Sequence, residues 1–187
     1  NGRMSETLRP STVLPSKRTA YVVETEDGIK LIAEVAQPIN PSLGALLMCH
    51  PNPTGGGMMD SHVYKKAANR LPALADLTIV RFNTRGTSSE QGTSTGEYGA
   101  TKSEKFDVEA MVAFCFDQLH LQNLWVVGWS FGTEISLKWA KDKRIKGLIL
   151  LSPPLMYTTE SELKFWSKDG RPIIALVPEE DEYLKPE

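Results

Sequence analysis

The sequence contains few cysteines and no long apolar segment. Its 187 residues include two cysteines, Cys49 and Cys115, and no Cys-x-x-Cys pair. This scarcity excludes a disulfide scaffold and a cysteine-based zinc site, and it fits a reducing compartment such as the cytoplasm. No apolar run approaches the roughly 18 residues that are needed to cross a bilayer. The first 20 residues also lack the hydrophobic stretch of a signal peptide.

An excess of charge of one sign is missing as well. The 21 Lys and Arg residues nearly balance the 23 Asp and Glu residues, which gives a net charge of −2. This balance argues against a protein dedicated to binding nucleic acid or an anionic membrane. The length fits one domain. We interpret residues 1–19 as a tag remnant before Met4 followed by an extended lead-in, and residues 20–187 as one domain.

Short apolar segments alternate with amphipathic or polar stretches along the chain. Segments 20–25 and 30–35 flank Asp27-Gly28, a hairpin-turn pair, so they predict two antiparallel strands. Further strands are expected at 44–49, 77–82, 124–127, 145–151 and 172–177, with helices at 62–75, 103–119, 133–143 and 161–167. Such alternation is typical of βαβ units around a parallel sheet. The sequence therefore predicts a three-layer α/β/α sandwich with a mostly parallel sheet and an N-terminal antiparallel hairpin.

The segment Gly128-Trp129-Ser130-Phe131-Gly132 lies between a predicted strand and a predicted helix. Gly-x-Ser-x-Gly in that place is the pattern of a nucleophile elbow. The two glycines leave room for a sharp turn, and Ser130 then lies at the positive end of a helix dipole. The N–H of Phe131 is free to bind an oxyanion. The alternative interpretation is a serine in an ordinary strand–helix turn.

Two more loops follow strands that end at the same edge of the sheet. The first, residues 50–57, begins His50-Pro51-Asn52 and ends in three glycines, but it lacks the Gly-Lys-Ser/Thr ending of a phosphate-binding P-loop. The second begins with Asn83-Thr84-Arg85-Gly86 and continues as a polar loop to residue 100. Arg85 could bind a substrate carboxylate or brace the loops by pairing with an acidic side chain, and bracing is the favoured interpretation.

Taken together, these motifs resemble the α/β-hydrolase superfamily, more narrowly its small, capless, dienelactone-hydrolase-like members. The resemblance covers about residues 20–187, and only about 20 residues separate the last two predicted strands, so a lid domain has no room there. The matched positions are His50, Pro51, Pro53, Gly55, Gly56, Asp60, Phe82, Asn83, Arg85, Gly86, Gly128, Ser130, Phe131, Gly132 and Asp181.

The resemblance implies a role for several of these residues. Ser130 would be the nucleophile, Asp181 the triad acid, and the backbone N–H groups of Phe131 and Asn52 the oxyanion hole. Glu179 and Glu180 are alternatives to Asp181. Residues that would support the site are His50, Arg85, Gly128 and Gly132. The expected partner is a small-molecule acyl substrate, with no cofactor and no metal. Candidate walls of an acyl pocket, of which at least half should be core residues, are Met58, Met59, Trp129, Phe131, Met156 and Tyr157.

One departure from the family pattern concerns the general base. The triad histidine should follow the acid, but all three histidines, His50, His62 and His120, precede Asp181. We therefore expect a chain truncated before the last strand and helix of the fold, with little activity unless His50 or His62 substitutes. His120 should lie at the opposite edge of the sheet. A missing strand would expose a sheet edge, through which the chain could form a homo-oligomer.

The function predicted from the sequence is a serine hydrolase that cleaves an ester, a thioester or an amide through an acyl-serine intermediate. An acyltransferase that uses the same site is a variant of this hypothesis. The second hypothesis is a non-catalytic α/β-hydrolase scaffold that acts as a binding or interaction module.

Overall fold

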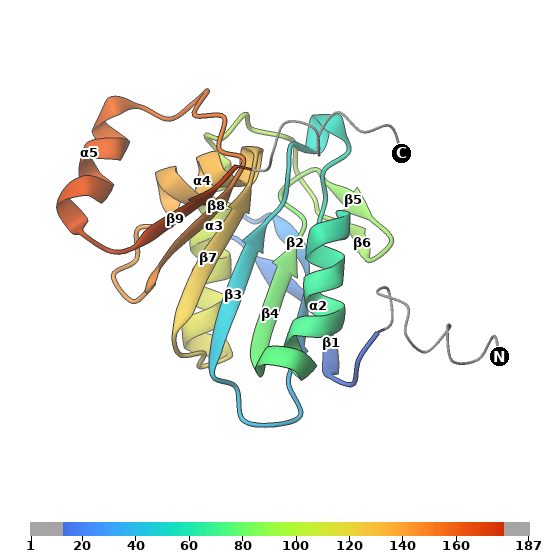
Figure 1. Ribbon diagram of the computed structural model, residues 1–187. Coiled ribbons are helices and arrows are strands. Elements are labelled where there is room, and N and C mark those ends of the chain that lie inside the picture. Colours follow the sequence, from blue (N-terminus) through green and yellow to red (C-terminus); the bar gives the residue numbers. More distant parts are fainter. Residues whose placement is uncertain (1–12, 178–187) are drawn as a thin grey trace.

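A computed structural model describes residues 13–177 of the chain. Its main sheet has seven strands in the order β1-β2-β4-β3-β7-β8-β9 (Figure 1). β1 and β2 form an antiparallel hairpin, β2 pairs antiparallel with β4, and the remaining neighbours are parallel. The predicted hairpin and parallel sheet are therefore confirmed. The strands are β1 (Lys17–Glu24), β2 (Lys30–Gln37), β3 (Gly44–Cys49), β4 (Leu77–Phe82), β7 (Leu124–Trp129), β8 (Gly147–Leu151) and β9 (Ile173–Leu176).

Helices cover both faces of the sheet, which gives the predicted three layers. α2 packs on one face, and α3 and α4 pack on the other (Figure 1). α3 continues into one π-helical turn, and α5 lies beside β9, toward the outside of the molecule. The helix bounds are α2 (His62–Ala75), α3 (Glu104–Ala113), the π-helical turn η2 (Phe114–Gln118), α4 (Phe131–Trp139) and α5 (Glu160–Asp169).

Several boundaries differ from the sequence prediction. β1 begins at Lys17, inside the expected lead-in, because Lys17 and Arg18 already pair with the end of β2. Arg18 also forms an ion pair of 2.7 Å with Glu34 of that strand. α4 begins at Phe131, two residues before the expected start, because the chain enters the helix directly from the turn at Ser130. The polar loop over 86–100 contains a small hairpin, β5 (Ser88–Ser89) and β6 (Gly92–Thr93). The expected tag remnant lies outside the described residues.

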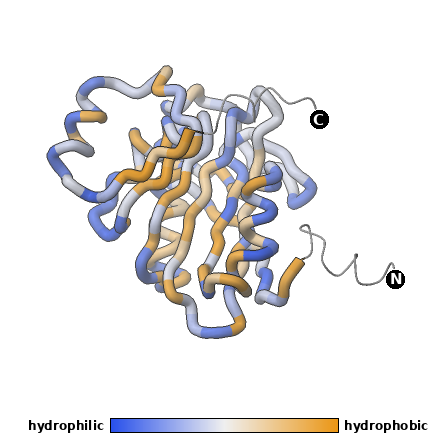
Figure 2. The backbone as a smooth tube through the Cα atoms, viewed as in Figure 1, coloured by the Kyte–Doolittle hydropathy of each residue, from blue (hydrophilic) through white to orange (hydrophobic). Residues whose placement is uncertain are grey.

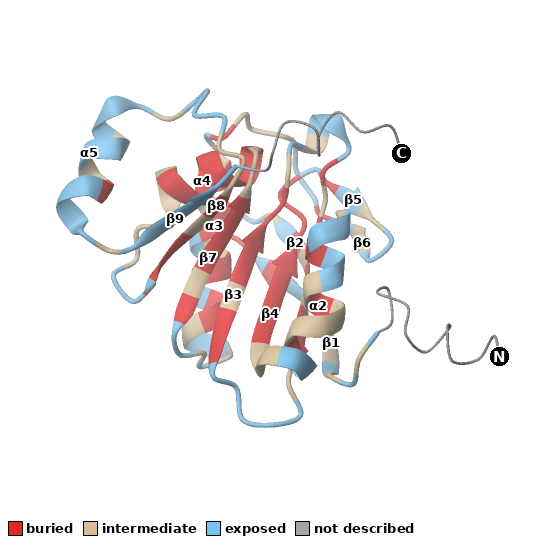
Figure 3. Cartoon of the chain, in the orientation of Figure 1, coloured by how far each residue is buried: buried red, intermediate tan, exposed pale blue. Residues whose placement is uncertain are grey.

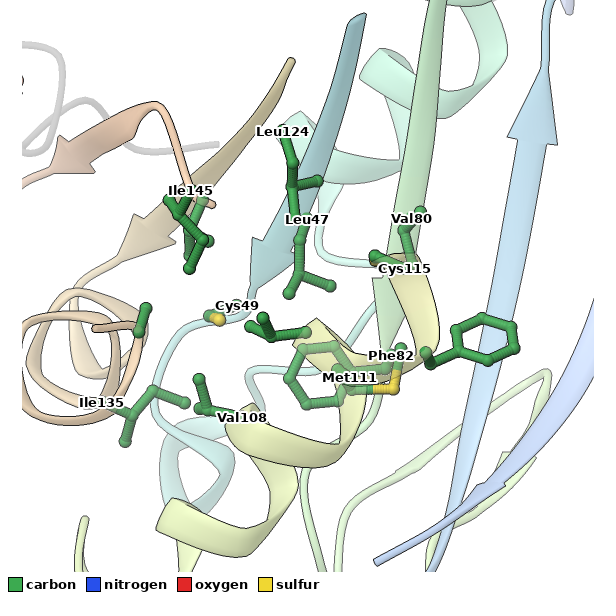
Figure 4. Close-up of a cluster of buried hydrophobic side chains, with 14 of the residues drawn as sticks. Leu47, Cys49, Val80, Phe82, Val108, Met111, Cys115, Leu124, Ile135 and Ile145 are labelled. Atoms are coloured by element: carbon green, nitrogen blue, oxygen red, sulfur yellow. The ribbon is translucent and has the colours of Figure 1, made fainter. Parts of the chain in front are cut away.

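The core lies on both faces of the central strands β4, β3 and β7. These strands are among the most buried and most hydrophobic parts of the chain (Figures 2 and 3). β3 is a nearly continuous apolar segment because it is covered on both faces. The larger of the two hydrophobic clusters lies under α3 and α4 and includes Leu47, Val80, Met111 and Ile135 (Figure 4).

The described sheet ends at β9, and this edge is poorly covered (Figure 3). Ile174 and Leu176 remain 46% and 52% exposed. α5 is fastened to α4 by a 2.8 Å hydrogen bond from the Trp166 indole N–H to the Leu137 carbonyl. Within residues 13–177, no helix is long and apolar enough to cross a membrane.

We predict that the buried centre of β3 contributes most strongly to stability. Leu47→Ala removes a fully buried side chain and should lower the free energy of unfolding by about 3 kcal/mol. Leu43→Ala is the matched control, because Leu43 is 67% exposed and its loss should cost less than about 0.5 kcal/mol. Urea denaturation of both variants measures the difference, and equal losses would contradict this description of the core.

Candidate functional site

Ser130 occupies the tight turn between β7 and α4. It has the backbone angles φ 54° and ψ −114°, a strained conformation for a residue other than glycine. The turn is held because the Ser130 N–H donates a 2.9 Å hydrogen bond to the Leu151 carbonyl at the end of β8. The Thr133 hydroxyl donates to the Ser130 carbonyl at 2.6 Å. Ser130 thus lies at the carboxyl edge of the sheet, directly before the N-terminus of α4.

The glycines on either side of this turn allow backbone segments to approach very closely. A Cβ atom on Gly132 would lie 2.0 Å from the Cys49 carbonyl oxygen at the end of β3. A Cβ atom on Gly128 would lie 2.4 Å from the Gly132 carbonyl oxygen. Both contacts are with backbone, which cannot move aside as the end of a side chain can. Only glycine therefore fits at these two positions without a shift of the strand or the helix.

The loop after β3 lies beside this turn. Cys49 pairs with Gly128 in the parallel register, so residues 50–52 extend from the sheet next to Ser130. Asn52 begins the short 3₁₀ helix η1 (Pro53–Gly55), and its carboxamide accepts a hydrogen bond from the Thr54 N–H at 3.0 Å. Its carbonyl accepts from the N–H groups of Gly55 and Gly57. These contacts fix the loop and do not use the Asn52 N–H.

Phe131 is the first residue of α4 and is 4% exposed. The first N–H groups of a helix have no acceptor within the helix. The Phe131 N–H therefore belongs to a set of donors at the positive end of the helix dipole. The arrangement brings two loop backbones, with Asn52 and Phe131, to the edge where Ser130 lies.

His50 is fully buried between the loop after β3 and the end of β4. Its Nδ1 lies 2.6 Å from the Pro51 carbonyl oxygen, and its Nε2 lies 3.0 Å from the Thr84 N–H. Since a carbonyl only accepts and an N–H only donates, Nδ1 carries the proton and Nε2 accepts. Burial lowers the pKa of His50 to about 4, so the ring is neutral near pH 7. Both ring nitrogens are occupied, so His50 cannot serve Ser130 as a base.

Asn83 connects the loop after β3 with the small hairpin. Its side-chain oxygen accepts a 2.9 Å hydrogen bond from the Met59 N–H. Its side-chain nitrogen donates to the Ser89 hydroxyl at 2.9 Å and to the Gly92 carbonyl at 3.2 Å. One buried carboxamide therefore sets the position of both segments beside the site.

Arg85 lies between two carboxylates rather than in an open position. Its guanidinium contacts Asp107 of α3 at 2.8 and 2.9 Å and Asp27 of the hairpin turn at 2.9 and 3.0 Å. The Arg85 N–H also donates to Asp107 at 2.8 Å. These contacts hold the loop after β4 against α3 and occupy most of the donors that could otherwise bind a substrate carboxylate.

The remaining predicted residues lie outside the described part of the chain, beside Trp129, or at the opposite edge of the sheet. Asp181, with its alternatives Glu179 and Glu180, lies outside the described residues. β9 ends at the same edge as the elbow strand, because Leu176 pairs with Leu151 and Leu151 with Trp129. His62 is exposed at the first position of α2, and its ring makes an edge contact with Trp129 at 5.5 Å. His120 lies before β7, at the opposite edge of the sheet.

Several residues that shape the site had no role predicted from the sequence. Asp107 pairs with Arg85, and Glu134 of α4 accepts hydrogen bonds from Tyr157 and Thr158 in the loop before α5. A signal for Asp107 was present: it precedes Val108 and Met111 on the inward stripe of its helix, where a carboxylate needs a partner. No comparable signal identified the partners of Glu134.

Comparison with known proteins agrees with this geometry. The sequence profile of the α/β-hydrolase fold matches residues 44–178. A serine hydrolase without a lid from Xanthomonas campestris is 24% identical with a TM-score of 0.68, over 88% of this chain and 85% of that one. A serine hydrolase homologue from Coxiella burnetii is 24% identical with a TM-score of 0.65, over 86% of each chain.

A third solved structure has the same fold but is more distant in sequence. An esterase from Pyrococcus furiosus is 19% identical with a TM-score of 0.64, over 82% of this chain and 59% of that one. No curated protein sequence matches the chain. At these identities the structural likenesses establish the fold alone.

We predict that Gly132 cannot be replaced without loss of stability. Gly132→Ala places a methyl group 2.0 Å from a backbone oxygen, which should lower the free energy of unfolding by about 3 kcal/mol. Gly55→Ala is the matched control, because no atom lies within 4 Å of its Cβ position. Equal stability of both variants in thermal and urea unfolding would contradict the close approach of α4 to β3.

We also predict a pH dependence of stability that arises from His50. As the pH falls below 6.5, the unfolded chain takes up a proton on this residue first, whereas the folded protein does so only near pH 4. The stabilisation from neutral His50 is complete above pH 6.5 and is lost as the pH falls to 4, by about 3 kcal/mol in total. His50→Gln should therefore show a flatter stability curve over this range. Parallel curves would contradict the neutral, buried state.

Proposed function

The chain belongs to the α/β-hydrolase fold family, and from this membership and the turn at Ser130 we propose that it is a serine hydrolase. It cleaves an ester, a thioester or an amide through an acyl-Ser130 intermediate. The observation that carries the proposal is the strained backbone of Ser130, with φ 54°, on a turn that two glycines allow. Such strain persists where the surrounding structure holds it and is concentrated at functional sites.

The proposed reaction begins with attack of the Ser130 hydroxyl oxygen on the substrate carbonyl carbon. The carbonyl oxygen becomes negative as the O–C bond forms. The bond from the carbonyl carbon to the leaving group then breaks, and the leaving group departs with the proton that the Ser130 hydroxyl has lost. Water then hydrolyses the acyl-Ser130 ester, which releases the acid and restores the hydroxyl. The N–H groups of Phe131 and Asn52 stabilise the oxyanion, and each such donor can be worth about 3 kcal/mol. The proposal is supported by the register of β3 and β7, which extends both backbones beside Ser130.

We propose Asp181, five residues beyond the end of β9, as the triad acid. Neither His50 nor His120 is assigned as the general base, since the ring nitrogens of His50 are both occupied and His120 lies at the other edge of the sheet. A serine hydrolase without its base typically loses about 10⁴- to 10⁶-fold in rate. Covalent labelling is therefore a better test than turnover, because a slow reaction still accumulates product.

A second candidate function is a non-catalytic scaffold that binds a partner. It is favoured by one observation, the hydrogen bonds that remove His50 from a catalytic role. Under this alternative Ser130 would keep its strained turn but would not react with an electrophile at an enhanced rate.

We predict that a fluorophosphonate labels this protein at Ser130. Labelling should reach one group per chain, and peptide mass spectrometry should locate it at Ser130, because the N–H donors favour the phosphonyl oxygen. Ser130→Ala should abolish labelling, whereas the control Ser161→Ala, in exposed α5, should leave it unchanged. Labelling that survives Ser130→Ala would refute the nucleophile assignment, and no labelling of the wild-type chain would favour the scaffold.

A further inference from the structure

Glu134 fastens the loop before α5 to the helix that begins at the elbow. It lies in the first turn of α4 and is 1% exposed. One carboxylate oxygen accepts a hydrogen bond from the Tyr157 N–H and the other accepts one from the Thr158 hydroxyl. A buried carboxylate with both oxygens bonded holds its partners firmly. The loop over 152–159 is thereby fixed one helical turn away from Ser130.

The same loop carries large apolar side chains that the core does not use. Leu155, Met156 and Tyr157 are 46%, 74% and 45% exposed. Its backbone includes Ser152 and Leu155 at positive φ, a conformation that needs support from outside the loop. The Ser152 N–H donates a 2.8 Å hydrogen bond to the Leu176 carbonyl of β9, and Glu134 holds the loop farther along, at Tyr157 and Thr158. The loop therefore holds exposed apolar side chains in place near the N-terminus of α4.

Tyr98 approaches the elbow from a different loop. Its ring lies 5.6 Å from the ring of Phe131, the residue after Ser130. The next residue, Gly99, donates a 2.7 Å hydrogen bond to the buried side chain of Glu104. Burial raises the pKa of Tyr98, and the nearby Tyr157 and Glu104 raise it further. Tyr98 packs on Phe131, and the Tyr157 backbone is bonded to Glu134 in the first turn of the same helix. Two loops more than 50 residues apart therefore bring these tyrosines to the N-terminal end of α4.

We propose that Tyr98 and Tyr157 form the wall that selects the acyl group, and that Glu134 is the positioning residue that holds Tyr157 in this wall. The inference rests on the proposed function and names its substrate class, which is esters or related compounds with a planar aromatic acyl group. An aromatic acyl group can stack or make edge contacts with both rings, whereas a straight alkyl chain of similar size cannot. The opposite side of the turn also carries an aromatic ring, since Trp129 packs against Tyr64 at 5.7 Å.

Two p-nitrophenyl phosphonates test this wall, one with a benzyl group and one with an n-hexyl group on phosphorus. Attack of the Ser130 oxygen forms the O–P bond, breaks the bond from phosphorus to p-nitrophenolate and releases the serine proton to solvent. Absorbance of p-nitrophenolate gives each rate. The ratio of the benzyl rate to the hexyl rate reports selection, because the reactivity of Ser130 affects both rates alike.

The wild-type chain should prefer the benzyl phosphonate by about 10-fold. Tyr98→Leu and Tyr157→Leu should each lower this ratio to about 3 or less, while Tyr157→Phe, which keeps the ring, should retain it. Tyr21→Leu is the matched control, because Tyr21 lies on β1, where it packs against Phe114 and is away from the elbow. The benzyl-to-hexyl ratio of this variant should equal that of the wild type.

Two variants test the positioning role of Glu134. Glu134→Gln keeps the size of the side chain but loses one acceptor oxygen, and Thr158→Val removes one donor. Each should lower the benzyl-to-hexyl ratio and speed hydrogen exchange at the Tyr157 amide. If both tyrosine-to-leucine variants kept the wild-type benzyl-to-hexyl ratio and were still labelled by the fluorophosphonate, the proposed wall would be wrong but the proposed function would stand. No reaction of the wild-type chain with either phosphonate would instead contradict the proposed function.

Discussion

The site depends on a single close approach, that of α4 to the end of β3. Gly132 lies so near the Cys49 and His50 carbonyl groups that a side chain has no room. Because α4 begins this close to the sheet, the chain must turn sharply at Ser130, and the residue takes a positive φ. The same approach aligns the positive end of the α4 dipole with the loop after β3. The position of Ser130, its strain and its neighbouring N–H donors are therefore consequences of one backbone contact.

Buried polar contacts keep the surrounding loops in register with that turn. His50 bridges the loop after β3 to Thr84, Asn83 bridges it to the small hairpin, and Arg85 ties the loop after β4 to α3. Each group is taken out of water, so loss of one partner would leave the other unsatisfied at a cost of about 1–3 kcal/mol. The loops are held by contacts within the protein, and none of these three groups has a step in the proposed chemistry.

The sequence predicted the sheet and the elbow well because both are local signals. Apolar segments marked β3, β4 and β7 almost to the residue, and the glycine spacing marked the turn. The sequence did not predict pairings between distant residues, such as Arg85 with Asp107 or Glu134 with Tyr157, because those depend on how helices pack on the sheet. The protonation of His50 also followed only from its two partners in space. Asp181 stays a prediction from the family pattern.

A crystal structure of the chain after reaction with a fluorophosphonate tests the central claim most directly. The account predicts an adduct on Ser130 whose phosphonyl oxygen lies within about 2.7–3.1 Å of the N–H groups of both Phe131 and Asn52. An adduct whose oxygen contacts neither N–H, with the loop over 50–57 turned away from Ser130, would contradict it.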